Sequence, residues 1–481
     1  MIFNSLSYLL LLLTVITLYW LLPYRARLVL IFSASLIFYG FWKINFIPVL
    51  LISVIVDWWV SQKMLKSDKR KRFFLLLGSL TTNLGLLFYF KYLIFFADSS
   101  IGFANLLGTE LDPIAFKIIL PLGISFYTFQ TISYTVDVYR GFIKPEKDFI
   151  LFACYVTFFP QLVAGPILRA KEVIPQFTNR PSFSFDYIFI GIRFILFGLF
   201  LKVVMADNLS ILVDSGFAID VKYMSAIDVW TLAFLFGFQI YFDFSAYSFI
   251  ALGSARMMGI IFPNNFNFPY ISTSPKDFWQ RWHISLSSWI RDYLYLPLNK
   301  AKVLDRSEGG LAKVVKTKGT NKSLFITMGL MGLWHGANWT FLIWGIYHAI
   351  VISIYRLIEP KTLNFSKRFR FLGGILVTLP VMMLSWIPFR ANSLNDTLGM
   401  WLKIFNPLAY TWLGMRENVY IITFLVLISF FIVYLFKVKI LPIINSKKFI
   451  SIICDIILIT FVTSMVIVFF RSINQFIYFQ F

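Results

Sequence analysis

The chain has 481 residues, of which 59% are hydrophobic and only 14% are charged, and its mean hydropathy is +0.76. Soluble domains are about 45–50% apolar and roughly 25% charged, so this composition excludes an ordinary soluble enzyme and a disordered chain. On a soluble protein, the net charge of +21 would point to nucleic acid. Here the basic residues lie in short connectors between apolar runs, as the positive-inside rule expects, so no nucleic-acid partner is expected.

Apolar segments recur along the whole chain and predict an all-α polytopic integral membrane protein. At about 20 residues per span, we expect about 10–13 transmembrane or re-entrant helices, with amphipathic helices at the interface. The expected spans are Leu6–Leu22, Leu28–Trp42, Phe46–Val60, Phe73–Ala97, Ile114–Tyr139, Phe149–Val163, Tyr187–Met205, Val229–Leu252, Leu324–Leu357, Phe371–Ile387, Tyr420–Phe436 and Ile450–Phe470. We treat residues 1–481 as one membrane domain with N-terminal helices (1–113), a core (114–406) and C-terminal helices (407–481).

The connectors of the N-terminal third differ in charge. Arg25 and Arg27 lie in one connector, six lysines and arginines lie in 63–72, and Arg140, Lys144 and Lys147 follow a later span. The connector 98–113 carries three acidic residues and no lysine or arginine. Because basic connectors stay on the cytoplasmic side, we expect the N-terminus and the connector 98–113 outside.

Residues 264–322 are the least lipid-like part of the chain. Within them, Phe278–Tyr295 has aromatic residues at helical spacing interleaved with charges, which by itself indicates an amphipathic helix on the membrane surface. His283 lies in this stretch and does not fit a passive surface role. The lysine- and glycine-rich segment Lys300–Lys322 predicts a flexible cytoplasmic loop.

The chain contains three histidines, His283, His335 and His348. His335 lies in an apolar run, where an ionisable side chain is either functional or a neutral imidazole that ties two helices together. The expected span 324–357 can hold two short helices. On one straight helix, however, His335 and His348 would lie about 20 Å apart, so His348 would support the site from a distance unless the helix breaks near Gly345.

Two other features of the sequence concern packing and charge. Gly332 and Gly336 have the GxxxG spacing that lets a neighbouring helix pack closely. Asp243 is a second buried-looking charge, which we interpret first as a structural carboxylate paired with an arginine or capping a helix. The sequence contains no phosphate-binding loop, no dinucleotide fingerprint and no complete GxSxG elbow, and we expect no metal site.

Several stretches in chain order resemble the membrane-bound O-acyltransferase family, in its bacterial branch that O-acetylates exported polysaccharides such as alginate. The motifs are Pro121–Gly141, Phe159–Arg169, Leu201–Asn208, Asp277–Leu298, Trp334–His348, Trp386–Arg390 and Phe476–Phe481. Two departures are Phe249, where the family usually has a second carboxylate after the YFDFS motif, and Pro388, which interrupts a usually aromatic pair.

The resemblance implies that His335 is the essential histidine inside a central tunnel and that His283 is a second functional histidine. An alcohol is a poor nucleophile at neutral pH, so acyl transfer to a sugar hydroxyl needs a base, for which a neutral imidazole is suited. His283, Trp334 or Asn338 would donate a hydrogen bond to the developing oxyanion. We also expect His348, Asp243 and Arg291 to bind substrate or to support these residues.

The sequence therefore predicts an O-acyltransferase, most simply an O-acetyltransferase, in the bacterial cytoplasmic membrane. The expected donor is cytoplasmic acetyl-CoA or another acyl thioester, with no bound cofactor. The expected acceptor is an exported glycan or a periplasmic acetyltransferase partner, and the remaining partners are membrane lipids. Two alternatives stay open, namely a different acceptor (teichoic acid, lipid or protein) and a proton-coupled transporter, which the lack of internal repeats disfavours.

Overall fold

The computed structural model describes residues 1–481 except 180, 302, 306–312, 315–318, 363–365 and 471–481. Much of the loop expected over Lys300–Lys322, and the Phe476–Phe481 motif, therefore lie outside the described residues. The described part of the Lys300–Lys322 segment includes two short antiparallel strands, β1 (Val303–Asp305) and β2 (Lys313–Val314).

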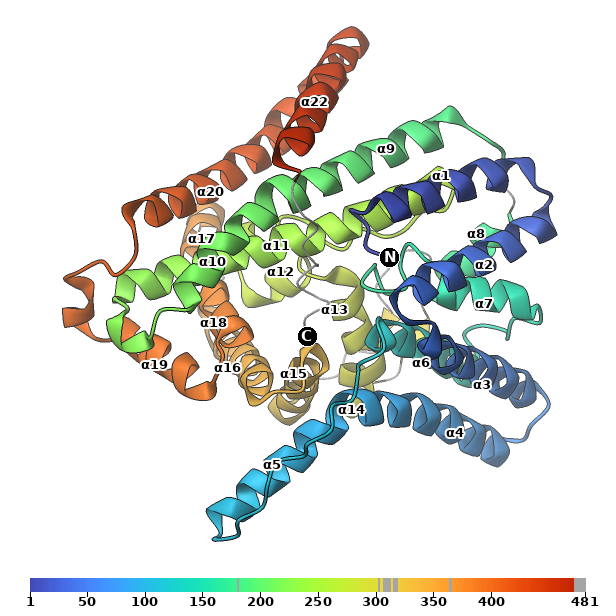
Figure 1. The fold of residues 1–481 in the computed structure, drawn as a ribbon, viewed down its shortest axis with the longest axis horizontal. Helices are drawn as coiled ribbons and strands as arrows, with labels where there is room; N and C mark the ends of the chain where they lie inside the picture. The colour runs from blue at the N-terminus through green and yellow to red at the C-terminus, as the bar shows by residue number, and fades with distance from the viewer. Residues whose placement is uncertain (180, 302, 306–312, 315–318, 363–365, 471–481) are drawn as a thin grey trace.

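The described residues form a bundle of helices, as the composition predicts (Figure 1). The N-terminal helices are α1 (Leu6–Leu21), α2 (Tyr24–Lys43), α3 (Ile47–Leu65), α4 (Lys69–Leu87) and α5 (Leu93–Leu106). The core helices are α6 (Ile124–Arg140), α7 (Phe149–Thr157), α8 (Ala170–Thr178), α9 (Phe185–Leu199), α10 (Asp207–Phe217), α11 (Ala226–Met257), α12 (Pro275–Trp279), α13 (Ile284–Ile290), α14 (Leu296–Leu298), α15 (Asn321–His335), α16 (Trp339–Thr362), α17 (Lys367–Leu384), α18 (Trp386–Arg390) and α19 (Leu394–Ile404). The C-terminal helices are α20 (Glu417–Leu435), α21 (Leu441–Asn445) and α22 (Lys448–Phe469).

Short π- and 3-10-helical segments join several of these helices. The π segments are η2 (Phe88–Tyr92), η3 (Phe200–Ala206), η6 (Arg291–Tyr295) and η8 (Phe436–Ile440). The 3-10 segments are η1 (Ile44–Phe46), η4 (Val221–Tyr223), η5 (Pro269–Ile271) and η7 (Pro407–Tyr410).

Among the described residues, eight stretches are long and apolar enough to cross a membrane, and Leu6–Leu21 is a shorter apolar helix. The first of these stretches, Tyr24–Leu65, contains both α2 and α3, with 20 and 19 residues. A helix rises about 1.5 Å per residue, so each of them can span the hydrocarbon core alone. The protein is a multi-pass membrane protein, as its sequence predicts.

Helix α11 lies at the centre of the bundle, and α20 and α22 lie at its edge (Figure 1). In the most apolar part of α11, 83% of the residues are buried in protein, compared with 11% in the corresponding part of Phe449–Phe469. α11 begins with a capping box in which Ser225 and Asp228 satisfy each other's backbone donors. It is therefore the buried helix around which the others pack.

The expected run 324–357 is a helical hairpin of α15 and α16, one of the two arrangements that the sequence left open. A side chain on Gly332 would meet the carbonyl oxygen of Phe341, and one on Gly345 would meet the carbonyl oxygen of Met328. The two backbones are thus in direct contact, and α16 is the neighbouring helix that the glycine spacing of α15 predicts. The chain turns at Gly336–Asn338, directly after His335.

The segment 275–295 differs from the amphipathic surface helix that its pattern indicates. It consists of α12, α13 and η6, with a sharp turn at His283, whose φ is 41°. Phe278, Trp282 and Leu286 are buried, so the surface interpretation is wrong. The aromatic stripe packs against the core of the protein, and single-sequence periodicity cannot distinguish that environment from the headgroup layer.

Three basic connectors lie on one side of the bundle, as the expected orientation requires. Arg25 forms an ion pair with Asp148, and Gln62 donates a hydrogen bond of 2.5 Å to the carbonyl of Glu146. Arg72 donates to the carbonyl of Tyr139 at 2.8 Å. α5 continues through Leu106, so the connector expected to begin at residue 98 is helical in its first half.

This arrangement yields a test of orientation. In a Cys454→Ser background, a cysteine at the exposed Thr109 is expected to react with an impermeant thiol reagent in intact cells, and one at the exposed Lys66 is not. Cys154 remains as a buried residue that stays unlabelled. Labelling only at position 66 would reverse the orientation of the whole bundle.

Candidate active site

His335 is the last residue of α15 and lies at the break between the two helices of the hairpin. Its ring is surrounded by Trp334, Trp344 and Phe389, with centroid distances of 5.0, 4.9 and 5.2 Å. The residue is 4% exposed. The histidine therefore faces the protein interior, as the sequence predicts, and Gly336 in an extended conformation ends the helix beside it.

His283 lies at the apex of the turn between α12 and α13 and is fully buried. Its Nδ1 is 3.1 Å from Oδ1 of Asn265, which also accepts a hydrogen bond of 2.9 Å from the hydroxyl of Ser285. Its ring lies 4.5 Å from that of Phe244 and 6.4 Å from that of Trp334. Trp334, the chain neighbour of His335, thus packs near His283, and the fold brings the two predicted catalytic histidines close together.

His348 is closer to His335 than a straight helix would allow. The ring of Trp344 contacts both, at 4.9 Å from His335 and 4.7 Å from His348. The helix breaks at Gly336–Asn338 and not near Gly345, because the close packing of α15 on α16 requires Gly345 inside the second helix. Neither ring nitrogen of His348 has a hydrogen-bond partner among the described residues, and its ring packs against the same tryptophan as the ring of His335.

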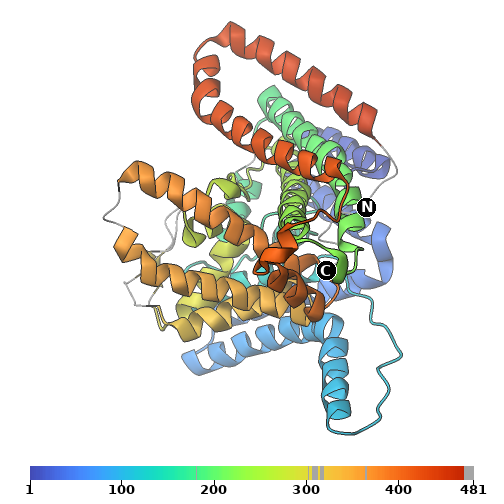
Figure 2. The same ribbon diagram turned by 90° about the vertical axis from the view of Figure 1, so that its left-hand side faces the viewer.

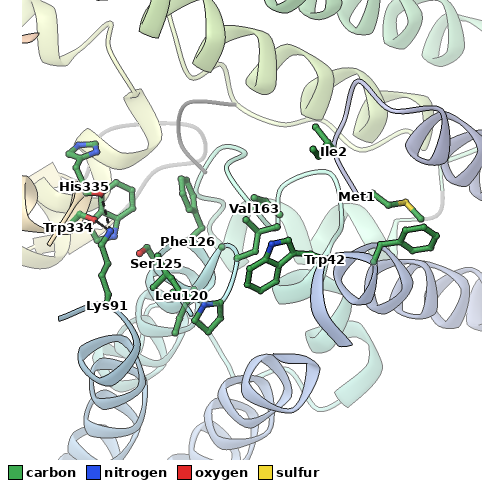
Figure 3. A pocket seen from close by; sticks show the side chains of 15 residues that line it. Met1, Ile2, Trp42, Lys91, Leu120, Ser125, Phe126, Val163, Trp334 and His335 are labelled. Carbon is green, nitrogen blue, oxygen red and sulfur yellow. Dashed lines mark hydrogen bonds between the residues drawn. The ribbon is translucent and has the colours of Figure 1, made fainter. Parts of the chain in front are cut away.

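A pocket with a volume of about 300 Å³ reaches His335 (Figure 3). Its walls come from α2, η2, the start of α6 and the hairpin, together with the first residues of the chain. Gly123, at φ 70°, allows α6 to begin against the backbone of Leu162, where a side chain would collide with the carbonyl oxygen. Ser125, Phe126 and Trp334 line the pocket near the histidine.

The two non-histidine candidates for an oxyanion donor differ in their surroundings. Trp334 lines the pocket, is buried, and its indole Nε1 has no hydrogen-bond partner among the described residues. Asn338 is exposed, and its side-chain oxygen accepts a hydrogen bond of 3.0 Å from the backbone of Thr340. This bond caps the start of α16 and gives Asn338 a structural role that its sequence position did not indicate.

Asp243 is buried on α11 and paired with Lys202 of η3, with 2.7 Å between Oδ1 and Nζ. Lys202 also contacts Asp207 at 2.9 Å. The sequence predicted a structural carboxylate paired with an arginine or a helix end, and the partner is a lysine. The ion pair ties α11 to the π segment after α9, and Asp243 is not among the residues that line the His335 pocket.

Arg291 lies in η6 and is not among the described residues that line the His335 pocket. Its guanidinium contacts Asp292 at 2.7 Å, and Asp292 also pairs with Arg169 at 3.2 Å. The guanidinium of Arg169 lies 4.8 Å from the ring centroid of Tyr293. Arg291 thus belongs to a basic cluster at the end of α6 that contains Arg140, which is on the side of the basic connectors.

Two residues at the site went unnoticed in the sequence. Lys91 lines the pocket and donates to the carbonyl oxygens of Trp334 and His335. Asn265 orients His283. A lysine inside the apolar run Phe73–Ala97 was a signal that could have identified the first, because charges in a span are costly. Only the fold brings Asn265 to His283.

Alanine in place of His283 is expected to lower acyl transfer at least about tenfold, or about 1.4 kcal/mol in barrier, without loss of protein from the membrane. The reason is that His283 is buried beside Trp334 and cannot be a passive surface residue. Transfer is measured in membranes with labelled acetyl-CoA. Ser287→Ala, in the same segment but with a hydroxyl that donates to the carbonyl of Trp282, serves as the control. Unchanged turnover in His283→Ala would leave that histidine a packing role only.

Comparison with known proteins identifies relatives whose similarity covers the three histidines of this site. The model of the membrane-bound O-acyltransferase family matches residues 146–390, which include all three histidines. The chain is 37% identical to the probable alginate O-acetylase AlgI of Azotobacter vinelandii over 84% of this chain and 78% of the relative. It is 34% identical to the peptidoglycan O-acetyltransferase of Helicobacter pylori (76% and 71%) and 33% identical to the teichoic acid D-alanyltransferase of Streptococcus thermophilus (57% and 69%).

Proposed function

Because this chain belongs to the membrane-bound O-acyltransferase family, we propose that it transfers acetyl from a cytoplasmic thioester to an exported polysaccharide, with His335 as general base. The observation that carries this proposal is the position of His335, a buried histidine at a helix break that lines an internal pocket. The bacterial cytoplasmic membrane is the proposed location. The receiving hydroxyl belongs to the glycan or to a periplasmic protein that passes acetyl on.

In the proposed reaction, the imidazole of His335 takes the proton of the acceptor hydroxyl. At the same time, the hydroxyl oxygen attacks the carbonyl carbon of the thioester. The carbon–sulfur bond then breaks, and the imidazolium returns the proton to the thiolate that leaves. The indole N–H of Trp334 and the ring of His283 would stabilise the negative charge on the carbonyl oxygen. Aromatic rings surround His335, and with substrate in the pocket they would limit the access of water and favour transfer over hydrolysis.

The two substrates are proposed to reach His335 from opposite sides. The pocket is lined by the chain start and by residues 120–126, which follow the connector 98–113 and are expected on the outer side. It would therefore receive the acceptor. The basic cluster of Arg140, Arg169 and Arg291 is on the side of the basic connectors, where it would attract a phosphate-bearing donor such as acetyl-CoA.

The direct test uses inside-out membrane vesicles that contain the protein. Labelled acetyl-CoA added outside such vesicles should yield acetyl ester inside them when an acceptor glycan is enclosed. Vesicles without the protein serve as the control. Absence of protein-dependent ester would contradict the proposal, and ester formed on the outer face only would contradict transfer across the membrane.

The acceptor is the part of the proposal in which the relatives differ. Two of the relatives named above are O-acetylating proteins that match more than 70% of this chain, and the D-alanyltransferase matches 57%. This difference favours acetyl on a glycan over D-alanine on teichoic acid. Supplying a D-alanyl thioester in the same vesicles separates the two, because only the preferred acyl group should be transferred.

A further inference from the structure

Lys91 is a lysine inside an apolar stretch of the chain, between α4 and α5. It belongs to the π segment η2, and single π turns within helices often lie at functional sites because they redirect side chains. Lys91 extends from this segment toward the hairpin and ends at the backbone of Trp334 and His335 (Figure 3).

The ammonium group of Lys91 donates to the carbonyl oxygen of Trp334 at 2.5 Å and to that of His335 at 3.1 Å. The next residue, Tyr92, donates through its hydroxyl to the carbonyl of Leu333 at 3.1 Å. These are the last three residues of α15, whose carbonyls have no partner within the helix. In the membrane interior such groups must be satisfied by protein, and the negative end of the helix dipole favours a cation there.

The same lysine lines the pocket that contains His335. Among the described residues, no aspartate or glutamate lines this pocket. Within the part of the chain that the structure describes, the hydrogen bonds of Lys91 go to the carbonyls of Trp334 and His335. These two hydrogen bonds place the Nζ of Lys91 on the backbone of the residue that we propose as general base, as well as at the end of α15.

We propose that Lys91 is a positioning residue for acyl transfer. Its ammonium group fixes the final turn of α15 and thereby the direction from which the His335 ring reaches the pocket. This inference rests on the proposed role of His335 as general base. It assigns to α4–η2–α5 a part in catalysis although this segment precedes the region that the family model matches.

The test compares three variants of the purified full-length protein with acetyl-CoA as the donor. Lys91→Met keeps the length of the side chain and removes its charge and donors. We expect kcat to fall about tenfold with the KM for acetyl-CoA within about twofold, because misplacing a base by an ångström is costly. Lys91→Arg, which keeps charge and donors, should recover most of the rate. Tyr92→Phe removes a bond to the same helix end one residue farther away and should stay within about twofold of wild type.

Three results would overturn the proposal. The first is an unchanged kcat in Lys91→Met. The second is an equal loss in the methionine and arginine variants together with a lowered melting temperature in detergent, which would make Lys91 structural only. The third is a raised KM with kcat retained, which would make it a donor-binding residue. A wild-type protein without transfer would instead contradict the proposed function, so the two failures are distinguishable.

Discussion

Replacing His335 by alanine is expected to lower acyl transfer by about 10²–10⁴-fold, the range that general-base catalysis contributes. The effect should be on turnover and not on insertion, because the ring packs against Trp344 and Phe389 while the hairpin is held by the glycine contacts of its backbone. Labelled acetyl transfer at equal protein amount is the measurement.

The variant His335→Gln distinguishes a base from a structural tie. Glutamine can still form hydrogen bonds but cannot accept the proton of a hydroxyl group at neutral pH. A catalytic role requires both variants to be inactive and both proteins to melt near the wild-type temperature in detergent. Activity in His335→Gln near the wild-type level would show that this histidine only joins two helices.

Lys202→Met is expected to destabilise the protein by about 3–5 kcal/mol, because it leaves the buried carboxylate of Asp243 without its cation. The carboxylate of Asp207 loses the same partner. The melting temperature in detergent should fall clearly. Lys222→Met is the matched control, since the ion pair of Lys222 with Asp220 is solvent-exposed and its loss should leave the melting temperature unchanged.

Adding Asp243→Asn to Lys202→Met tests whether Asp243 has a catalytic part. If the carboxylate is structural, neutralising both partners should restore much of the stability and the acyl transfer together, because the buried charge of Asp243 is gone and only the more exposed carboxylate of Asp207 lacks its partner. A double variant that is stable but inactive would assign Asp243 a role in the reaction. A Lys202→Met protein as stable as wild type would contradict the ion-pair argument itself.

The sequence by itself determined the membrane class, allowed two helices over 324–357 and singled out His335 as a candidate. These follow from local properties: apolar runs of sufficient length, a glycine spacing and an ionisable residue in an apolar helix. The basic connectors also predicted that they share one side of the membrane, and the contacts of Arg25, Gln62 and Arg72 place them on one side of the bundle. None of these inferences needs knowledge of which distant residues meet.

Only the tertiary structure decided the surroundings of the histidines. The stripe around His283 is buried because other helices cover it, and an aromatic face looks the same in sequence whether protein or headgroups cover it. His335 and His348 contact one tryptophan because the chain reverses at Gly336–Asn338, and that reversal depends on backbone packing across the hairpin. Lys91 reaches the carbonyl of His335 from 244 residues away, since the orphan carbonyls of a broken helix take their donors from whichever element packs there.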